Sequence, residues 1–359
     1  MLIRFILWFV LFPCMLCCTE GLKYECLHIK DGDITVHLLE IDPSYYEIKP
    51  IRAMDDGLGR ESVLSICKRY GASAAINGGF FTIGTTYDGK PCGALKIEKW
   101  YALSTKPRGA IGWSSNNKPL LDRIEMKITL SNGYKVDGFN CPRQNGKMIL
   151  FNSCFHKTTL TDIEGQELII VNNKIKTINN SGSGKIPSDG YVLSIHKNHP
   201  LFNKFTLGDD LLISLEILPI LYPKNREEWE NFDYVVGGCP LLINHNVKFT
   251  DFSFEKTNDT FLYKNHARTA VGIKPNGHWL FVVIDRIGKF RGMTIDELAT
   301  LMQKLGCHDA LNLDGGRSST MVYGRDVKNF PQDDETEAQE LNGIRRVSDA
   351  IVVIPKCKN

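Results

Sequence analysis

Short apolar runs separated by turn residues dominate the chain. The first three runs lie at 24–29, 34–41 and 46–51, and the segments between them, 31–33 and 42–44, consist of Asp, Gly, Pro and Ser. These residue types favour turns, and the length of each run is typical of a β-strand. The pattern therefore predicts that the chain opens with a meander of strands.

Two segments show helical spacing instead. Residues 60–70 carry clustered apolar side chains and are followed by Gly71, a residue common at helix C-termini. Residues 295–305 place their apolar side chains on one helical face, and Thr294 followed by Glu297 matches a capping box at the helix start. We expect one helix in each segment.

The rest of the chain returns to strand patterning. Short apolar runs alternate with turns over about 111–218, and Pro275-Asn276-Gly277 separates strand-like runs at 268–273 and 279–285. Strands with a few interspersed helices predict an α+β fold. We expect a single large domain over 22–359, with a mixed, mainly hairpin-connected β-sheet core and a few flanking helices.

The N-terminus has the layout of a secretory signal peptide. One positive charge, Arg4, precedes an unbroken apolar run at 5–12. The alternative is an uncleaved membrane anchor, but Pro13 interrupts the run, which is short for a bilayer core of about 30 Å. We therefore predict a signal peptide at 1–21, a secreted or otherwise exported protein, and no membrane association after cleavage.

Charge and cysteine content limit the partners and the compartment. The 359 residues include 43 Lys and Arg against 41 Asp and Glu, without a long basic run, which argues against nucleic acid as a partner. Loss of residues 1–21 would leave eight cysteines, an even number that permits disulfides in an exported protein. Cys26 with Cys357 and Cys141 with Cys154 are plausible pairs. No tight Cys/His cluster is present in the sequence, so we predict neither a metal site nor a cofactor.

Four apolar runs end in polar residues or glycines, and chemistry is expected there. The four ends are Asn77-Gly78-Gly79, Gly237-Gly238, Asp285 and the segment Asp314-Gly315-Gly316-Arg317-Ser318-Ser319-Thr320. Glycines let the backbone approach a ligand closely, and hydroxyls and amides donate hydrogen bonds. If these strand ends lie side by side, they line one crevice together with Arg268.

Each candidate also has a purely structural interpretation. Asp285 could open a turn, Asn77 could cap a strand, and Arg268 could be a surface ion-pair partner. Asp314, which precedes two glycines, is the hardest to explain in this way. The chain contains no G-x-S-x-G, H-E-x-x-H or G-x-x-x-x-G-K-[ST] motif, which argues against a serine hydrolase, a zincin and a nucleotide triphosphatase.

Six segments taken together resemble the phosphodiester glycosidase family. They are Asn77-Gly78-Gly79-Phe80-Phe81, Val236-Gly237-Gly238-Cys239-Pro240-Leu241-Leu242, Asn265-His266-Ala267-Arg268-Thr269-Ala270-Val271-Gly272, Gly292-Met293-Thr294, Asn312-Leu313-Asp314-Gly315-Gly316-Arg317-Ser318-Ser319-Thr320-Met321 and Arg346-Val347-Ser348-Asp349-Ala350. The resemblance covers about 72–354 and keeps the order of the segments.

The chain departs from the family pattern at two positions. Arg317 and Cys239 stand where the family usually has glycine. If the glycine at the first position is needed for a positive φ, Arg317 is strained or displaces the chain. Alternatively, Arg317 adds a cation to the pocket.

The resemblance implies a hydrolase that cleaves a sugar similar to N-acetylglucosamine from a sugar-1-phosphodiester at the anomeric carbon. Such a reaction needs a nearby carboxylate as nucleophile or as base for water, and Asp314 and Asp285 are the two best placed by strand position, with Asp314 the more important. Phosphate would be bound by Arg268 and Arg317 and by the backbone around Gly78, Gly79, Gly315 and Gly316. Sugar groups would be bound by Asn77, Ser318, Ser319 and Thr320. The partner is then a sugar phosphate or glycan.

Two other classes of function stay open from the sequence. Arg317 and Cys239 favour a secreted carbohydrate-binding protein that keeps the pocket but has lost turnover. Asp285 and Asp314 could instead hold Ca²⁺ or Mg²⁺ in a metal-dependent phosphodiesterase.

Overall fold

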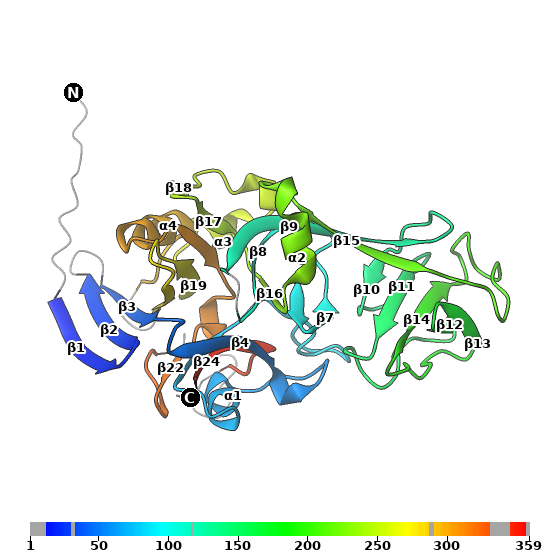
Figure 1. Cartoon of the computed structure of the whole chain (residues 1–359), viewed down its shortest axis with the longest axis horizontal. Coiled ribbons are helices and arrows are strands. Elements are labelled where there is room, and N and C mark those ends of the chain that lie inside the picture. Colours follow the sequence, from blue (N-terminus) through cyan, green and yellow to red (C-terminus); the bar gives the residue numbers. More distant parts are fainter. Residues whose placement is uncertain (1–11, 30–32, 116–117, 287–290, 331–344, 357–359) are drawn as a thin grey trace.

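The computed structural model describes residues 12–29, 33–115, 118–286, 291–330 and 345–356, and only the backbone of 12–18. Its secondary structure is mainly β, in four sheets with a few short helices (Figure 1). The prediction of a domain with a hairpin-rich sheet core and few helices is confirmed.

The largest sheet has eight strands in the order β1-β2-β3-β20-β19-β21-β17-β18. Its strands are β1 (Phe12–Thr19), β2 (Leu22–Ile29), β3 (Ile34–Ile41), β20 (Trp279–Ile284), β19 (Arg268–Ile273), β21 (Asp309–Asn312), β17 (Leu241–Asn244) and β18 (Val247–Lys248). All neighbours in it are antiparallel. The first two runs of the predicted opening meander, now β2 and β3, and the 268–285 hairpin lie here. The third run, Tyr46–Arg52, pairs with Asp349–Pro355 in a different sheet, so the prediction of one continuous meander is wrong for that strand. β1 falls within the predicted signal peptide, which stays a prediction, and residues 1–11 lie outside the described part.

Two further sheets complete the body of the molecule. One has the order β23-β22-β5-β24-β4, with β4 (Tyr46–Arg52), β5 (Ala74–Asn77), β22 (Met321–Tyr323), β23 (Asp326–Val327) and β24 (Asp349–Pro355). The other has the order β15-β9-β8-β16-β6-β7, with β6 (Leu95–Ile97), β7 (Lys99–Ala102), β8 (Arg108–Trp113), β9 (Leu120–Leu130), β15 (Ile213–Pro219) and β16 (Tyr234–Gly237).

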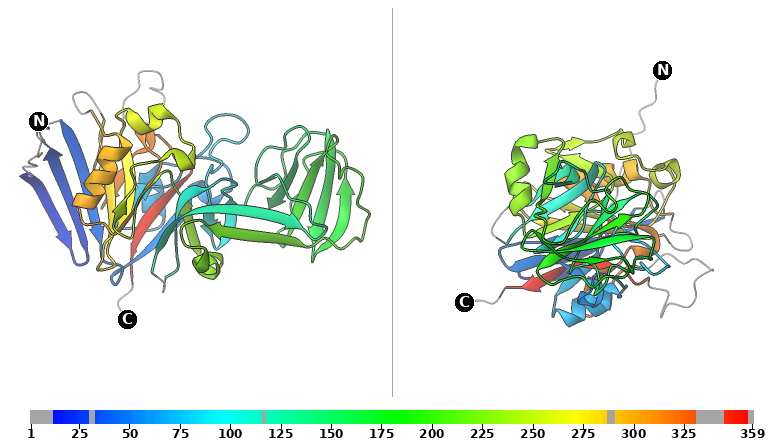
Figure 2. Two further views of the ribbon diagram at one scale, coloured as in Figure 1. Left: turned by 90° about the horizontal axis from the view of Figure 1, so that it is seen from above. Right: turned by 90° about the vertical axis from the view of Figure 1, so that its right-hand side faces the viewer.

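A fourth sheet forms a lobe that projects from the body, as Figures 1 and 2 both show. Its order is β10-β11-β14-β12-β13, with β10 (Gly138–Phe139), β11 (Met148–Asn152), β12 (Gly165–Val171), β13 (Lys174–Asn179) and β14 (Gly190–His196). The long antiparallel pair β9 and β15 connects this lobe to the body (Figure 2). The lobe has its own apolar core around Leu150, Leu168 and Leu193.

Alternating side chains on the strands build the main core. In β19, Val271 and Ile273 face a cluster shared with the other two body sheets, whereas Ala270 faces the opposite side. Leu311, Ile76 and residues of β8 and β16 meet in the same shared cluster. This period of two is what a sheet buried on both faces requires. The three body sheets therefore pack around one common core.

Short helices cover the outer faces of these sheets. They are α1 (Val63–Arg69), α2 (Arg226–Asn231), α3 (Asp259–Tyr263) and α4 (Ile295–Lys304), with 3-10 turns η2 (Ala53–Asp55), η3 (Pro223–Asn225), η4 (Ser253–Glu255) and η5 (Gly316–Ser318). α1 and α4 confirm the two predicted helices. The Thr294 and Glu297 capping box is formed in both directions, and α4 packs its buried face against the eight-stranded sheet.

The described cysteines do not form disulfides. Cys26, Cys141 and Cys154 are among seven described cysteines that are all free. Cys141 packs toward Gly138 in the lobe, whereas the backbone of Cys154 is held by Asn152, so the predicted Cys141–Cys154 bridge is wrong for this structure. The other predicted pair includes Cys357, which lies outside the described residues.

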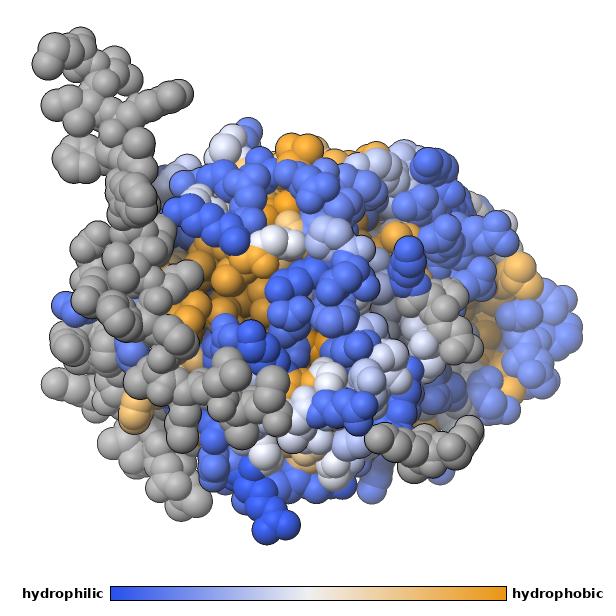
Figure 3. Space-filling view, turned by 60° about the vertical axis from the view of Figure 1, so that its left-hand side comes forward, coloured by the Kyte–Doolittle hydropathy of each residue, from blue (hydrophilic) through white to orange (hydrophobic). Residues whose placement is uncertain are grey.

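The surface is mostly hydrophilic on the face that Figure 3 shows, with its largest apolar area left of the centre and smaller ones at the top and near the right edge. In the described part of the chain, no helix has both the length and the apolar character needed to cross a membrane.

Close backbone packing at the strand ends gives the first prediction. A Cβ added to Gly238 would lie 2.3 Å from the Asn312 carbonyl oxygen, whereas one added to Gly93 would meet nothing closer than 3.6 Å. We expect Gly238→Ala to lower the free energy of unfolding by about 1–3 kcal/mol, because the backbone must move. The matched variant Gly93→Ala should change it by less than about 0.5 kcal/mol. Urea unfolding of both variants checks this, and equal effects would contradict it.

Candidate active site

The ends of β5 and β21 meet at Asp314. The Asp314 amide donates to the Gly78 carbonyl (3.2 Å), and the Asn77 side-chain Nδ2 donates to the Asp314 carbonyl (2.8 Å). These bonds join segments more than 230 residues apart in the chain. The predicted side-by-side placement of the Asn77 and Asp314 strand ends is therefore present in the structure.

The Asn77 side chain holds three neighbouring segments together by hydrogen bonds. It is fully buried, and its Oδ1 accepts hydrogen bonds from the Thr269 hydroxyl (2.8 Å) and the Thr320 amide (3.1 Å). Because both ends of the amide are bound to the protein, Asn77 positions the loop that follows β21. Its predicted role in binding sugar is not supported by this geometry.

A second carboxylate, Asp349, lies next to the same loops. It stands at the start of β24, it is 1% exposed, and its Oδ1 accepts a hydrogen bond from the Gly79 amide (3.0 Å). A Cβ at Gly78 would come within 1.9 Å of that oxygen, so only glycine fits there. Burial raises the pKa of Asp349, although the charge of Arg52 and hydrogen bonds from Ser348 and Gly79 oppose the shift.

Asp314 has the electrostatics of a functional carboxyl group. Burial among protein groups raises its pKa to about 6, and the negative charge of Asp349 acts in the same direction. The Ser318 hydroxyl, the Gly315 amide (2.9 Å) and the charge of Arg345 partly offset this rise. Unlike Asp349, Asp314 keeps part of its surface exposed. A partly accessible carboxyl group with a perturbed pKa is a common feature of active sites.

The conformation of the loop after Asp314 shows how Arg317 is accommodated where the family usually has glycine. Gly316 has φ +60°, but Arg317 is not among the residues with positive φ. The side chain of Arg317 is 6% exposed. Arg317 is therefore accommodated without backbone strain. Gly315 is needed for close approach, because a Cβ there would lie 2.8 Å from the Ala267 carbonyl oxygen.

The three hydroxyls of the loop are inaccessible in this conformation. Ser318, Ser319 and Thr320 are each 0% exposed. Among the residues that the structure describes, the hydroxyls of Ser319 and Thr320 have no hydrogen-bond partner. Their predicted role in binding sugar stays a prediction, and it requires the loop to open.

Arg268 is largely occupied by the protein itself. It is 1% exposed, its Nε donates to the Met293 carbonyl (2.9 Å), and its Nη2 donates to the carbonyls of Phe261 (2.7 Å) and Lys264 (3.1 Å). Burial lowers its pKa to about 10, although the charge of Glu297 opposes that shift. Arg268 therefore ties α3 and the start of α4 to β19, which leaves little of its guanidinium for a bidentate phosphate contact.

Asp285 belongs to a separate network. It is fully buried at the end of β20, where its Oδ2 pairs with His37 Nε2 (2.9 Å) and its Oδ1 accepts from the Phe330 amide (3.1 Å). No hydrogen bond or ion pair joins it to Asp314 in the described part of the chain. The structure thus brings Asp349, and not Asp285, into electrostatic contact with Asp314.

A cavity of about 400 Å³ lies beside these strand ends. Gly237, Gly238 and Phe80 line it, and the ring of Phe261 contacts Phe80 edge-to-face at 5.9 Å. A Cβ at Gly79 would lie 2.8 Å from the Gly237 carbonyl oxygen, so the Asn77 and Gly237 strand ends are also neighbours. Three of the four predicted strand ends therefore lie together.

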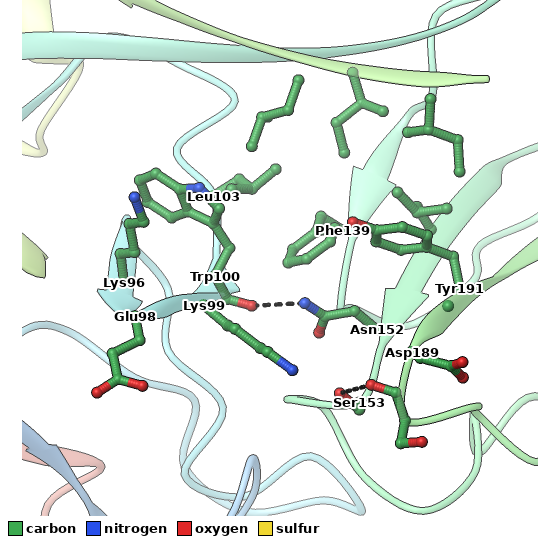
Figure 4. A pocket seen from close by; sticks show the side chains of 16 residues that line it. Lys96, Glu98, Lys99, Trp100, Leu103, Phe139, Asn152, Ser153, Asp189 and Tyr191 are labelled. Carbon is green, nitrogen blue, oxygen red and sulfur yellow. Dashed lines mark hydrogen bonds between the residues drawn. The ribbon is translucent and has the colours of Figure 1, made fainter. Parts of the chain in front are cut away.

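A second cavity, of about 500 Å³, lies between the body and the lobe. Figure 4 shows Trp100 on one side of it and Phe139 and Tyr191 on the other, with a hydrogen bond from Asn152 Nδ2 to the Trp100 carbonyl (3.0 Å). None of the predicted site residues lines this cavity.

A metal site finds no support in the arrangement of ligands. Within the described ranges, no three His, Cys, Asp or Glu side chains are grouped so that they could hold a metal ion. Asp285 and Asp314, the pair considered from the sequence, point into different networks.

The sequence interpretation missed Asp349 and Arg345. Both stand in or next to the segment Arg346-Val347-Ser348-Asp349-Ala350, which carried part of the family resemblance. The sequence feature that could have indicated Asp349 is its position directly before the apolar run at 350–354, whereas only the ends of apolar runs were considered. Because the sheet is antiparallel there, the start of β24 lies beside the end of β5.

Comparisons with known proteins identify related sequences and a shared fold. A family model described as phosphodiester glycosidase matches residues 165–354. An uncharacterized Rickettsia conorii protein is 29% identical over 240 residues, which cover 62% of this chain and 78% of that protein. The N-acetylglucosamine-1-phosphodiester alpha-N-acetylglucosaminidase of Bos taurus is 32% identical over 137 residues, which cover 35% of this chain but only 26% of the bovine protein. A crystal structure of a hypothetical Synechocystis protein shares the fold with a TM-score of 0.79 at 23% identity, over 94% of this chain and 63% of that one.

The buried Asp285–His37 pair gives a prediction about pH. Burial opposes the charge on His37, but hydrogen bonding to Asp285, with a smaller effect of Cys26, raises the pKa of His37 to about 9. Because this value exceeds the usual 6.5, the pair stabilises the fold fully below about pH 6.5, and this contribution is lost as the pH rises through 9. We expect a loss of about 3 kcal/mol over that range.

Urea unfolding of wild type and His37→Gln between pH 6 and 10 tests this. The variant should lose most of the wild-type slope, whereas the matched variant His245→Gln, whose side chain is 53% exposed, should keep it. An unchanged slope in His37→Gln would rule out the charged pair.

Proposed function

This chain belongs to the phosphodiester glycosidase family, and from that premise we propose that it hydrolyses the bond between the anomeric carbon of a sugar and the phosphate of a phosphodiester. The observation that supports this most is the pair of neighbouring carboxyl groups, the partly exposed Asp314 and the buried Asp349, on strand ends with glycine backbones. The bovine relative's name makes an N-acetylglucosamine-like sugar the first substrate to test.

Asp314 is the proposed reacting group. Cleavage of the bond between the anomeric carbon and the phosphate oxygen leaves positive charge on the sugar, which a neighbouring carboxylate stabilises. The departing phosphate monoester carries the electron pair away and is a weak base, so the reaction needs little assistance from an acid. A carboxylate then either attacks the anomeric carbon or takes a proton from the attacking water. The configuration of the released sugar, followed by NMR, distinguishes these two routes.

Asp349 and Asn77 are proposed as positioning residues. The Asp349 carboxylate accepts a hydrogen bond from the Gly79 amide, and the negative charge of Asp349 raises the pKa of Asp314. Asn77 fixes the Asp314 carbonyl. Neither group is free to move toward a ligand, because each is fully buried and hydrogen-bonded. The predicted signal peptide would place this activity outside the cell or in another exported compartment, and the domain at 22–359 would be the catalytic unit.

Replacing the reacting carboxylate is the direct test. Asp314→Asn should reduce kcat for a GlcNAc-1-phosphodiester by at least about 1000-fold, because a neutral amide can neither attack nor take a proton. The melting temperature should stay nearly unchanged. Asp326→Asn, at a carboxylate that is 75% exposed, is the matched control and should retain full activity. Retained turnover in Asp314→Asn would refute the assignment, and a wild type without any turnover would favour a binding protein.

The pH dependence gives an independent test. Since Asp314 must be ionised and its pKa is about 6, kcat/KM should fall as the pH drops below about 6, instead of near the usual 3.9. Arg345→Gln should move this acid limb to higher pH, because the charge of Arg345 lowers the pKa of Asp314. An acid limb that does not respond to Arg345 would assign it to another group. Full activity after EDTA treatment would argue against a metal-dependent phosphodiesterase.

A further inference from the structure

The 400 Å³ cavity beside the strand ends carries positive charge without a matching negative one. Arg108, at the start of β8, and Lys256, in the turn after η4, both line it, and none of its lining residues is acidic. The nearest described carboxylate in sequence, Glu255, is already committed to Arg123 (3.0 Å) and to the amides of Gly109 (2.8 Å) and Leu241 (2.9 Å). The cavity therefore favours an anion.

Arg108 has a buried donor that the protein leaves unused. Its Nη1 is shielded from solvent and has no hydrogen-bond partner among the described residues. A buried guanidinium N–H without an acceptor is costly, and a rotation of the Arg108 side chain into the cavity that it lines would bring this donor to a ligand. Arg268 differs in this respect, because backbone carbonyls already accept from its Nε and Nη2.

Thr257 offers a second unused polar atom at the same place. Its Oγ1 is also buried without a partner in the part of the chain that the structure describes. Lys256, next to it, has φ +50°, a left-handed conformation that non-glycine residues adopt rarely. The backbone thus turns sharply where a cation and a hydroxyl meet the cavity.

The cavity is close to the proposed reacting carboxylate. Its wall includes Gly237 and Phe80, and Gly79, which precedes Phe80, packs against the Gly237 carbonyl. Gly78 in turn accepts the Asp314 amide (3.2 Å). Only Gly79 therefore lies between the wall residue Phe80 and Gly78, the residue bonded to Asp314.

We propose that this cavity binds the phosphate of the substrate, with Arg108, Lys256 and Thr257 as its ligands. The role of this cavity in the reaction rests on the proposed glycosidase activity, but the binding of phosphate to the cavity can be measured without turnover. Arg108 can offer charge-assisted hydrogen bonds to phosphate oxygens, Thr257 a hydroxyl donor, and Lys256 a point charge at the rim.

The chain offers a built-in probe for this binding. Cys92 lines the cavity with an exposed thiol, whereas Cys239, which also lines it, is buried and has a pKa raised chiefly by burial. Inorganic phosphate should slow alkylation of Cys92 in wild type, as followed by peptide mass spectrometry. Sulfate should do the same more weakly, and acetate should not.

Variants then test the ligands. Arg108→Gln should weaken phosphate binding by at least about ten-fold in calorimetry and raise KM for the phosphodiester by a similar factor. It should fold normally, because Arg108 makes no side-chain hydrogen bond within the described chain. Lys256→Gln and Thr257→Val should each weaken binding several-fold. Arg226→Gln and Lys176→Gln, which change exposed residues outside the cavity, are the matched controls and should change nothing.

The possible outcomes separate the two proposals. If wild type hydrolyses the phosphodiester but Arg108→Gln keeps its KM and its affinity for phosphate, the subsite is refuted and the glycosidase stands. If phosphate protects Cys92 through Arg108 but wild type shows no hydrolysis, the subsite stands and the glycosidase is refuted. Equal protection of Cys92 in wild type and Arg108→Gln also refutes the subsite.

Discussion

The buried amide of Asn77 is the interaction on which the geometry of the site depends. It accepts from Thr269 and Thr320 and donates to the Asp314 carbonyl, so one side chain joins β5, β19 and both ends of the loop after β21. A carboxylate in its place could not donate, and an aliphatic side chain would leave three buried groups unpaired. The loop that carries Asp314 is held in place because this single polar group is fully satisfied.

Glycines next to Asn77 let the strand ends come closer than side chains would allow. Gly78 lies against Asp349, Gly79 against the Gly237 carbonyl, and Gly238 against the Asn312 carbonyl, each within the distance that a Cβ would need. Backbone amides therefore reach the carboxylates directly, as the Gly79 amide reaches Asp349. Gly237 and Gly238 also contribute only backbone to the wall of the adjacent cavity, which leaves room there for an anion.

Local features of the chain were predictable from its sequence, and long-range partners were not. The capping box of α4 and the 268–285 hairpin depend on residues a few positions apart, and both formed as expected. Asp285 was a second candidate beside Asp314, because each follows an apolar strand. What separates them is His37, 248 positions away in the chain, which neither spacing nor composition could pair with Asp285. The commitment of Arg268 to backbone carbonyls was hidden for the same reason.

A sugar phosphodiester needs a negative charge near its anomeric carbon and positive charges near its phosphate. In this protein, Asp314 carries the first, and Arg108 and Lys256 carry the second. The developing positive charge at an anomeric carbon needs a carboxylate that is ionised near neutral pH, and Asp314, which is partly exposed and has a pKa of about 6, meets this condition. The phosphate needs cations, which would lower that pKa if they paired with Asp314 itself. Arg108 and Lys256 avoid this conflict, because they line a cavity that Asp314 does not line and they are not among the groups that shift its pKa. Under the proposed assignment, the cations and the carboxylate are carried by different elements, so phosphate can be bound without lowering the pKa of Asp314.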